Sequence, residues 1–441
     1  MRSHSLITGL GPVCALGLGP DAFWQSLLQG TIGIKPIESL DPSGFHVQLA
    51  GEVRDAKIRD FVPKTYRKAT KVMARDTELA VIAAKIAADD AGLKTRGSED
   101  NAEGFPLDPV RTGCQIGAGL IAAETEELAR AVVSAQDEQG RFSMDGWGTE
   151  GQGKSGMNNL PPLWLLKYLP NMLACHVTII HGLEGPSNTI MGAEASALLS
   201  IGESARVIER GSADICFTGG AESRINHLGL LRWEYAARLT PVTQDEDPAS
   251  VCKPYQPDSR GGLIGESGGM LVIESEDHAK ARDASAYARI IGFGAAQTPR
   301  PYIPATESMR AHDETDRGLS ASISHAMRDA GIEPDDIDAV LTLGIGEPTL
   351  DQMELGAITE ALDERSSTVP IVSLAHLTGN TMAGHAGLLT AAGALCLHNQ
   401  QIPQAMITRN PDAPASNLRR VLVCSPSLGG QAGALVLERM S

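Results

Sequence analysis

Residues 185–222 read GPSNTIMGAEASALLSIGESARVIERGSADICFTGGAE. The β-prone run Ser187–Met191 predicts a short strand, and Gly192 interrupts it at a tight turn. Apolar residues then recur at close to helical spacing, and Gly211 supplies the stop that predicts the helix C-terminus. The compact apolar run Ile215–Thr218 is typical of a strand buried on both faces. The stretch therefore predicts strand, turn, helix and strand, the rhythm of an α/β protein.

One residue, Glu194, lies at the turn where the predicted helix begins. A helix N-terminus carries free N–H groups and the positive end of the helix dipole, and both stabilise negative charge. The sequence therefore predicts that Glu194 faces a site suited to an anion.

This stretch resembles the nucleophile segment of the β-ketoacyl-acyl-carrier-protein synthases, whose pattern is roughly G-P-x-x-T-I-x-T-A-C-A-S-G. The cysteine that accepts the acyl group in that family falls on Glu194. Seven other positions match without a gap, namely Gly185, Pro186, Thr189, Ile190, Ala193, Ala195 and Ser196.

The resemblance extends from about Ser5 to Leu437. It includes SLITGLGPVCALG at 5–17, PNMLACHVTII at 170–180 and KPYQPDSRGGLIGESGGMLVIE at 253–274. It implies a thiolase-like α/β fold, layered α-β-α-β-α and built from two similar halves. We expect residues 1–252 and 253–441 to be these halves and to form one thiolase-like unit. The "DAGL" at 90–93 and the "DAGI" at 329–332 fit such a duplication.

The family's chemistry implies a reactive thiolate, two imidazoles that stabilise an enolate, a lysine and a phenylalanine gate. Other residues stand at all of these positions in this chain. They are Glu194 for the cysteine, Leu343 and Asn380 for the histidines, Ala375 for the lysine, and Pro426 and Leu428 at the gate.

Two nearby histidines are poor replacements. Aligning His385 with Asn380 would need five inserted residues, and His376 lies beside the lost lysine position at Ala375. Glu194 itself has two interpretations. It is either a polar side chain that fills the vacated site, or a base or nucleophile whose pKa is raised by burial.

The chain keeps the family's scaffold motifs but lacks its reacting groups. In this respect it resembles the chain-length factors, the non-catalytic partners of ketosynthases. The first hypothesis is therefore a catalytically degenerate homologue that pairs with an active ketosynthase in polyketide, polyene or fatty-acid-type biosynthesis. The alternative is a thioester-processing enzyme with altered chemistry that uses Glu194.

The resemblance also implies how the chain assembles. In this fold the strand before the nucleophile turn pairs with its twin across a two-fold axis, in a heterodimer with an active ketosynthase or in a homodimer. The partner would bring the acyl carrier protein, so that this chain meets it indirectly. The residues of the expected dimer strand are Ser187, Asn188, Thr189, Ile190 and Met191.

Composition limits which partners, cofactors and cellular location we expect for this chain. The net charge of −17 disfavours nucleic acid or an anionic membrane as a partner. Seven scattered cysteines without CxxC spacing predict neither a disulfide framework nor a zinc site, and no cofactor motif is present. No apolar run is long enough to span a bilayer, so we expect a cytoplasmic protein.

The Gly-rich segment 136–159 predicts a long loop or flap without a core of its own. We expect Cys175 and His176 to contribute to helix packing and not to catalysis.

Overall fold

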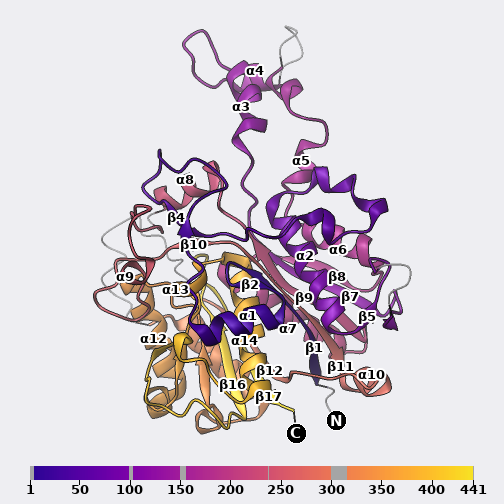
Figure 1. The fold of residues 1–441 in the computed structure, drawn as a ribbon, viewed down its shortest axis with the longest axis vertical. Coiled ribbons are helices and arrows are strands. Elements are labelled where there is room, and N and C mark those ends of the chain that lie inside the picture. Colours follow the sequence, from indigo (N-terminus) through magenta and orange to yellow (C-terminus); the bar gives the residue numbers. More distant parts are fainter. Residues whose placement is uncertain (1–3, 99–102, 149–154, 237, 299–314, 441) are drawn as a thin grey trace.

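A single twelve-stranded mixed sheet runs through the protein (Figure 1). The computed structural model describes residues 4–98, 103–148, 155–236, 238–298 and 315–440. The strands of the large sheet are β1 (Ser5–Cys14), β2 (Gly17–Leu18), β7 (Thr112–Ala118), β8 (Ser187–Ile190), β9 (Ile215–Glu222), β11 (Ser267–Ser275), β12 (Ala288–Gln297), β13 (Ala339–Leu341), β14 (Ile371–Val372), β15 (Ile407–Arg409), β16 (Arg420–Ser425) and β17 (Gln431–Arg439). Two small sheets join β3 (Lys35–Pro36) and β10 (Ile264–Gly265) to β4 (Leu49–Gly51), and β5 (Leu93–Lys94) to β6 (Phe105–Pro106).

The large sheet has two parts that meet at its centre. Its strand order is β15-β14-β13-β16-β17-β12-β1-β11-β9-β7-β8, with β2 attached to β1. Strands β1 and β12 pair only over Ser5–Ile7 and Ala288–Ile290, so this short antiparallel contact is the seam between the two parts. Strand β11 follows Lys253 in the chain but lies between β1 and β9. The division of the chain into halves at residue 252 stays a prediction.

Helices form three layers around the two parts of the sheet. In the middle layer, α7 (Ser196–Glu209) and α14 (His385–Asn399) contact strands of both parts. On one outer side, α2 (Arg75–Asp90) covers β1, β11 and β9, and α6 (Met172–His181) packs against α2. On the other outer side, α11 (Arg317–Ala330) covers β12 and β17 and packs against α12 (Pro348–Leu362). This arrangement confirms the predicted α-β-α-β-α layering.

Close packing of the middle layer depends on a glycine. A Cβ atom on Gly269 of β11 would lie only 2.6 Å from the carbonyl oxygen of Gly384 and from the amide nitrogen of Leu388. Helix α14 can therefore approach the sheet only because position 269 has no side chain. Gly269 belongs to the Gly-dense motif at 253–274, so one role of this motif is to allow the close packing of α14 on the sheet.

The stretch 185–222 forms the predicted strand, turn, helix and strand, with small shifts at the boundaries of these elements. Strand β8 ends at Ile190, α7 ends just before Gly211 (φ 72°), and β9 extends four residues past the predicted Thr218. A 3₁₀ turn at Ala193–Ala195 precedes α7, so Glu194 lies in this turn rather than on the first residue of the α-helix.

The described residues 124–148 and 155–168 include a projection that stands away from the layered body, and we call it the finger (Figure 1). It contains α3 (Thr125–Ser134), α4 (Met144–Gly148), the 3₁₀ turn Gly156–Asn159 and α5 (Trp164–Lys167). Within the predicted loop 136–159, residues 149–154 lie outside the described ranges. The described part of this segment is not only loop, because short helices form there. Ser155 and Gly156 are the only buried residues among its described positions, and Gly156 packs against α3, so this part has almost no core of its own.

The remaining helices are short or lie at the surface. They are α1 (Pro20–Gln29), α8 (His227–Tyr235), α9 (Pro248–Val251), α10 (Glu276–Ala281) and α13 (Ala375–Thr378). Among the described residues, no helix combines the length and apolar character needed to cross a membrane.

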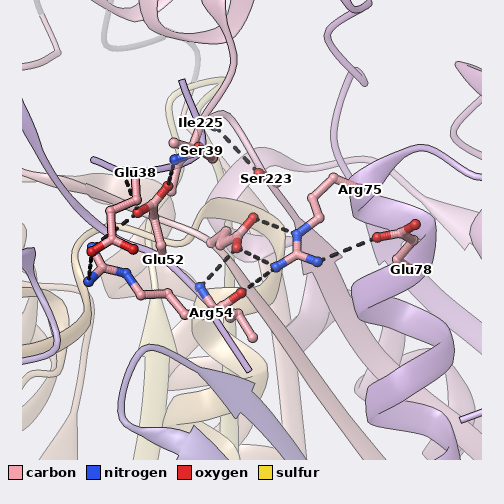
Figure 2. A network of polar contacts seen from close by, with 10 residues as sticks. Glu38, Ser39, Glu52, Arg54, Arg75, Glu78, Ser223 and Ile225 are labelled. Atoms are coloured by element: carbon pink, nitrogen blue, oxygen red, sulfur yellow. Dashed lines mark hydrogen bonds and ion pairs between the residues drawn. The ribbon is translucent and has the colours of Figure 1, made fainter. Parts of the chain in front are cut away.

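A polar network fastens the segment around β4 to the second part of the chain (Figure 2). Arg75 donates from Nε and Nη2 to the carboxylate of Glu266, at 3.1 and 2.7 Å, and also to the carbonyl of Val53 at 2.6 Å. Glu52 accepts hydrogen bonds from the backbone N–H groups of Glu38 and Ser39. Strand β10, adjacent to Glu266, pairs with β4 and thereby becomes a fixed support for the site described next.

Candidate functional site

Glu194 is buried at the turn between β8 and α7, with 1% of its surface exposed. The side-chain amide of Asn380 donates to its Oε1 at 3.3 Å, and the backbone N–H of Leu428 donates to its Oε2 at 2.9 Å. Both donors come from segments about 190 to 230 residues away in the chain. The hydrogen bonds to Glu194 therefore come from these two groups and not, as the sequence predicted, from the N–H groups of α7. The Ser196 hydroxyl at the start of α7 accepts instead from the backbone N–H of Gly192 at 2.8 Å.

Asn380 is held in a defined orientation. Its backbone pairs with β10, accepting from Gly265 at 3.0 Å and donating to Leu263 at 2.7 Å. Its side-chain oxygen accepts from the backbone N–H of Met382 at 3.0 Å, so the NH₂ group of the amide points toward Glu194. The amide thus supplies a neutral, fixed donor to the carboxylate.

The loop that carries Leu343 is held by two buried carboxylates from α12. Glu354 accepts from the backbone N–H groups of Leu343 and Gly344, each at 2.9 Å, and from the hydroxyls of Thr342 and Tyr255. Asp351 accepts from the backbone N–H groups of Gly346 and Tyr255. Burial and the closeness of the two acids raise the pKa of Asp351 well above its usual value, and burial also raises the pKa of Glu354.

The side chain of Leu343 packs into a small apolar cluster. Its partners are Ile345 and Ala375, with Leu350 at the border of the cluster. Leu343 stands at an expected histidine position and Ala375 at the expected lysine position, and their side chains belong to the same apolar cluster. Neither side chain can donate a hydrogen bond to a substrate.

The residues at the gate positions, Pro426 and Leu428, lie next to Glu194. Pro426 has no backbone N–H, and the N–H of Leu428, two residues on, points at the carboxylate. Glu194, Leu343, Pro426 and Leu428 line one cavity of about 20 Å³, which has room for about one water molecule. Arg238 also lines this cavity, and no motif in the sequence marks it as a site residue.

Behind the site lies a buried acidic cluster. Glu222 accepts from the backbone N–H of Ala383 at 3.0 Å and forms an ion pair with Arg224. Burial raises the pKa of Glu222, and the neighbouring Glu194 carboxylate adds to this effect. Burial, together with the charge of Glu222, raises the pKa of Asp76 to about 7. These acids are therefore costly to ionise together.

This cost predicts a pH-dependent gain in stability for Asp76→Asn. An unfolded chain releases the proton of an aspartate near pH 4, whereas the folded protein keeps it up to about pH 7. The folded state binds more protons between these values, so stability is lost as the pH rises from about 4 to about 7. Thermal unfolding of Asp76→Asn should show a larger gain at pH 8 than at pH 5. The exposed Asp55→Asn should show no such difference, and an equal gain for Asp76→Asn at both pH values would contradict the account.

The histidines considered as replacements lie away from this cavity. His385 is fully buried at the start of α14, where desolvation lowers its pKa to about 3. The Nε2 of His376 lies 2.8 Å from the carbonyl oxygen of Ala405. His176 packs as predicted, buried on α6 with its Nδ1 2.8 Å from the Tyr66 hydroxyl, while Cys175 beside it is half-buried. Among the described residues, no three His, Cys, Asp or Glu side chains could hold a metal ion.

The expected dimer strand lies at the end of the large sheet. Strand β8 pairs with β7 in parallel and has no other partner strand within the described ranges. Ser187 and Asn188 are exposed, Thr189 and Ile190 are half-buried, and Met191 just beyond the strand is exposed. The strand therefore presents an unpaired edge.

Comparison with known proteins covers nearly the whole chain. The family model for the β-ketoacyl synthase N-terminal domain matches residues 6–279, and the model for the C-terminal domain matches residues 287–408. A 3-oxoacyl-(acyl-carrier-protein) synthase 2 of Staphylococcus aureus is 30% identical over 92% of this chain and 91% of its own length. The protein of the same name from Coxiella burnetii is 29% identical over 100% of this chain and 99% of its own length.

Solved structures share the fold. The ishigamide ketosynthase/chain length factor matches with a TM-score of 0.79 and 23% identity, covering all of both chains. A type II polyketide synthase ketosynthase in complex with its acyl-carrier protein matches with a TM-score of 0.76 and 21% identity, again over all of both chains.

Proposed function

The chain belongs to the β-ketoacyl synthase family, and from this premise we propose that it is a catalytically silent, chain-length-factor-like partner of an active ketosynthase. The pair would act in polyketide, polyene or fatty-acid-type biosynthesis in the cytoplasm. The observation that carries the proposal is the bonded set of Glu194, Asn380 and Leu428. The family implies reacting or gating groups at these three positions. Here, Asn380 and Leu428 both donate hydrogen bonds to Glu194 instead.

The chemistry of these residues supports a silent subunit. A carboxylate cannot form the thioester that acyl transfer requires, and Leu343 has no donor for a developing enolate. The loss of one oxyanion donor alone costs about 3–4 kcal/mol of transition-state stabilisation. The cavity beside Glu194 is also too small for an acyl chain.

The alternative, in which Glu194 acts as a base or nucleophile, has less support. Both of its carboxylate oxygens already accept hydrogen bonds, and the side chain is almost fully buried. These contacts hold the carboxylate in place and leave little of it accessible to a substrate. In the preferred interpretation, this chain shapes the space into which the partner's acyl product extends, and the acyl carrier protein docks through the partner.

The direct test is acyl transfer to the purified chain. Incubation with radiolabelled acyl-carrier and malonyl-carrier substrates should give neither a protein-bound thioester nor a condensation product. An active β-ketoacyl synthase treated in parallel should give both. Stable labelling of this chain, or any condensation by it alone, would refute the proposal.

Restoring the nucleophile should separate acylation from condensation. Glu194→Cys places a thiol just before the N-terminus of α7, where the dipole lowers the thiol pKa. We expect this variant to accept an acyl label but to produce no condensation product, because Leu343 and Asn380 are unchanged. Glu194→Ala is the matched control and should accept no label. Efficient condensation by Glu194→Cys would mean that other residues perform the histidine roles.

A further inference from the structure

We propose that Glu194 is a latch that holds the loop 426–430 in one position, and that only a carboxylate at position 194 can hold it there. The loop joins β16 to β17 and carries Leu428, whose N–H donates to Glu194. The inference rests on the proposed function, because a loop latched beside the site would help to keep the chain silent. It also gives a reason for glutamate, and not a neutral amide, at this position.

Leu428 is held through both its backbone and its side chain. Its N–H donates to Oε2 of Glu194 at 2.9 Å. Its side chain packs against the apolar cluster that includes Trp233, Ile264 and Met382. The middle of the loop is therefore attached both to the turn before α7 and to a cluster formed by α8, β10 and their neighbours.

The end of the loop next to β17 is fixed by separate contacts. The side chain of Gln297 donates from Nε2 to the carbonyl of Gly429 at 2.9 Å, and the N–H of Thr298 donates to the carbonyl of Gly430 at 2.8 Å. Gly430 has a φ of 82°, in the left-handed region that glycine adopts without strain. Release of the latch should therefore free the middle of the loop while this end stays in place.

Both groups that bond to Glu194 are hydrogen-bond donors. Leu428 offers its backbone N–H, and Asn380 offers its NH₂ group. The Asn380 amide is fixed in this direction, because its oxygen already accepts from the N–H of Met382 at 3.0 Å. Position 194 therefore needs two acceptors. A carboxylate has an acceptor on each oxygen, whereas the amide of glutamine has one acceptor and one donor.

A glutamine at position 194 would satisfy only one of the two donors. With its oxygen toward Leu428, its NH₂ group would face the NH₂ group of Asn380. With its oxygen toward Asn380, its NH₂ group would face the N–H of Leu428. Reversal of the Asn380 amide would only move the conflict to the N–H of Met382. Each arrangement opposes two donors around a buried side chain, where an unsatisfied donor is costly.

The backbone on both sides of the latch is held in an unfavourable conformation. Ala193, directly before Glu194, has a φ of 47°, and Met382, which fixes the Asn380 amide, has a φ of 55°. Residues other than glycine keep left-handed backbone only where surrounding contacts impose it. The fold therefore holds the acceptor and the fixed donor in a defined geometry before the loop bonds to them.

Hydrogen–deuterium exchange of the purified full chain tests the latch. Mass spectrometry with fragmentation to single residues reports the exchange rate of the Leu428 N–H, which is the group that the latch holds. Glu194→Ala removes both acceptors, so this N–H should exchange at least about ten-fold faster than in the wild type. Glu203→Gln on α7 is the matched control, because it removes a carboxylate that pairs with Arg210 instead, and it should exchange at the wild-type rate.

A reciprocal exchange of the two side chains tests the need for a carboxylate. Glu194→Gln should also speed the exchange of the Leu428 N–H. Adding Asn380→Asp places an acceptor opposite the new NH₂ group and leaves an oxygen for the N–H of Met382. The double variant should therefore return to slow exchange. A side chain that merely fills space at position 194 would not produce this rescue.

The outcomes separate the latch from the proposed function. Wild-type exchange at Leu428 in Glu194→Ala would overturn the latch and leave the silent subunit standing, because acyl transfer tests that proposal independently. Fast exchange that persists in the double variant would overturn the need for a carboxylate. Faster exchange throughout β16, β17 and α14, and not in the loop alone, would mean that Glu194 supports the whole fold and would refute a local latch.

Discussion

Replacing Ile190 with lysine should abolish the proposed dimer and precipitate the free chain. Ile190 lies on β8, paired on one side with Gly117 of β7, while the other side of the strand is an unpaired edge. An obligate interface in this fold should bury well over ~2,000 Å², and a lysine at its centre would have to be desolvated without a partner. The exposed edge would then be an aggregation hazard.

Native mass spectrometry and sedimentation of the expressed protein measure this effect. Ile190→Val is the matched control and should preserve the dimer, because it keeps a β-branched apolar side chain. A soluble wild-type monomer at micromolar concentration would contradict the view that this chain is an obligate partner subunit.

Glu354→Ala should cause the largest loss of folding stability among the variants considered. Its carboxylate is the common acceptor for the backbone N–H groups of Leu343 and Gly344 and for two hydroxyls. Truncation leaves these buried donors unsatisfied, at about 1–3 kcal/mol each, reduced where water enters the vacated space. We expect the free energy of unfolding to fall by at least ~3 kcal/mol.

Urea unfolding followed by circular dichroism measures this loss. Glu354→Gln is the conservative control. It keeps the length of the side chain and one acceptor oxygen for the buried donors, so it should lose less stability than alanine does. Equal midpoints for Glu354→Ala and wild type would mean that the Leu343 loop does not depend on this carboxylate.

Much of the fold could be predicted because its signals are local. The run before Gly192, the helical spacing up to Gly211 and the apolar run from Ile215 are short-range patterns, and each became the expected strand or helix. The layered architecture followed from the family resemblance and not from these patterns. The short helices within 136–159 were not predicted, because a Gly-rich composition does not reveal that Gly156 packs against α3.

The motifs around Glu194, Leu343 and Asn380 align without gaps, so the positions expected to carry the family's reacting groups can be assigned from the sequence. How these residues contact one another depends on the packing of the folded chain. Glu194 receives its hydrogen bonds from Asn380 and Leu428, and Leu343 packs against Ala375. These partners are tens to hundreds of residues apart in the chain. Such contacts arise from the stacking of α7 and α14 between the two parts of the sheet, and no local pattern encodes which distant donor a buried carboxylate will meet.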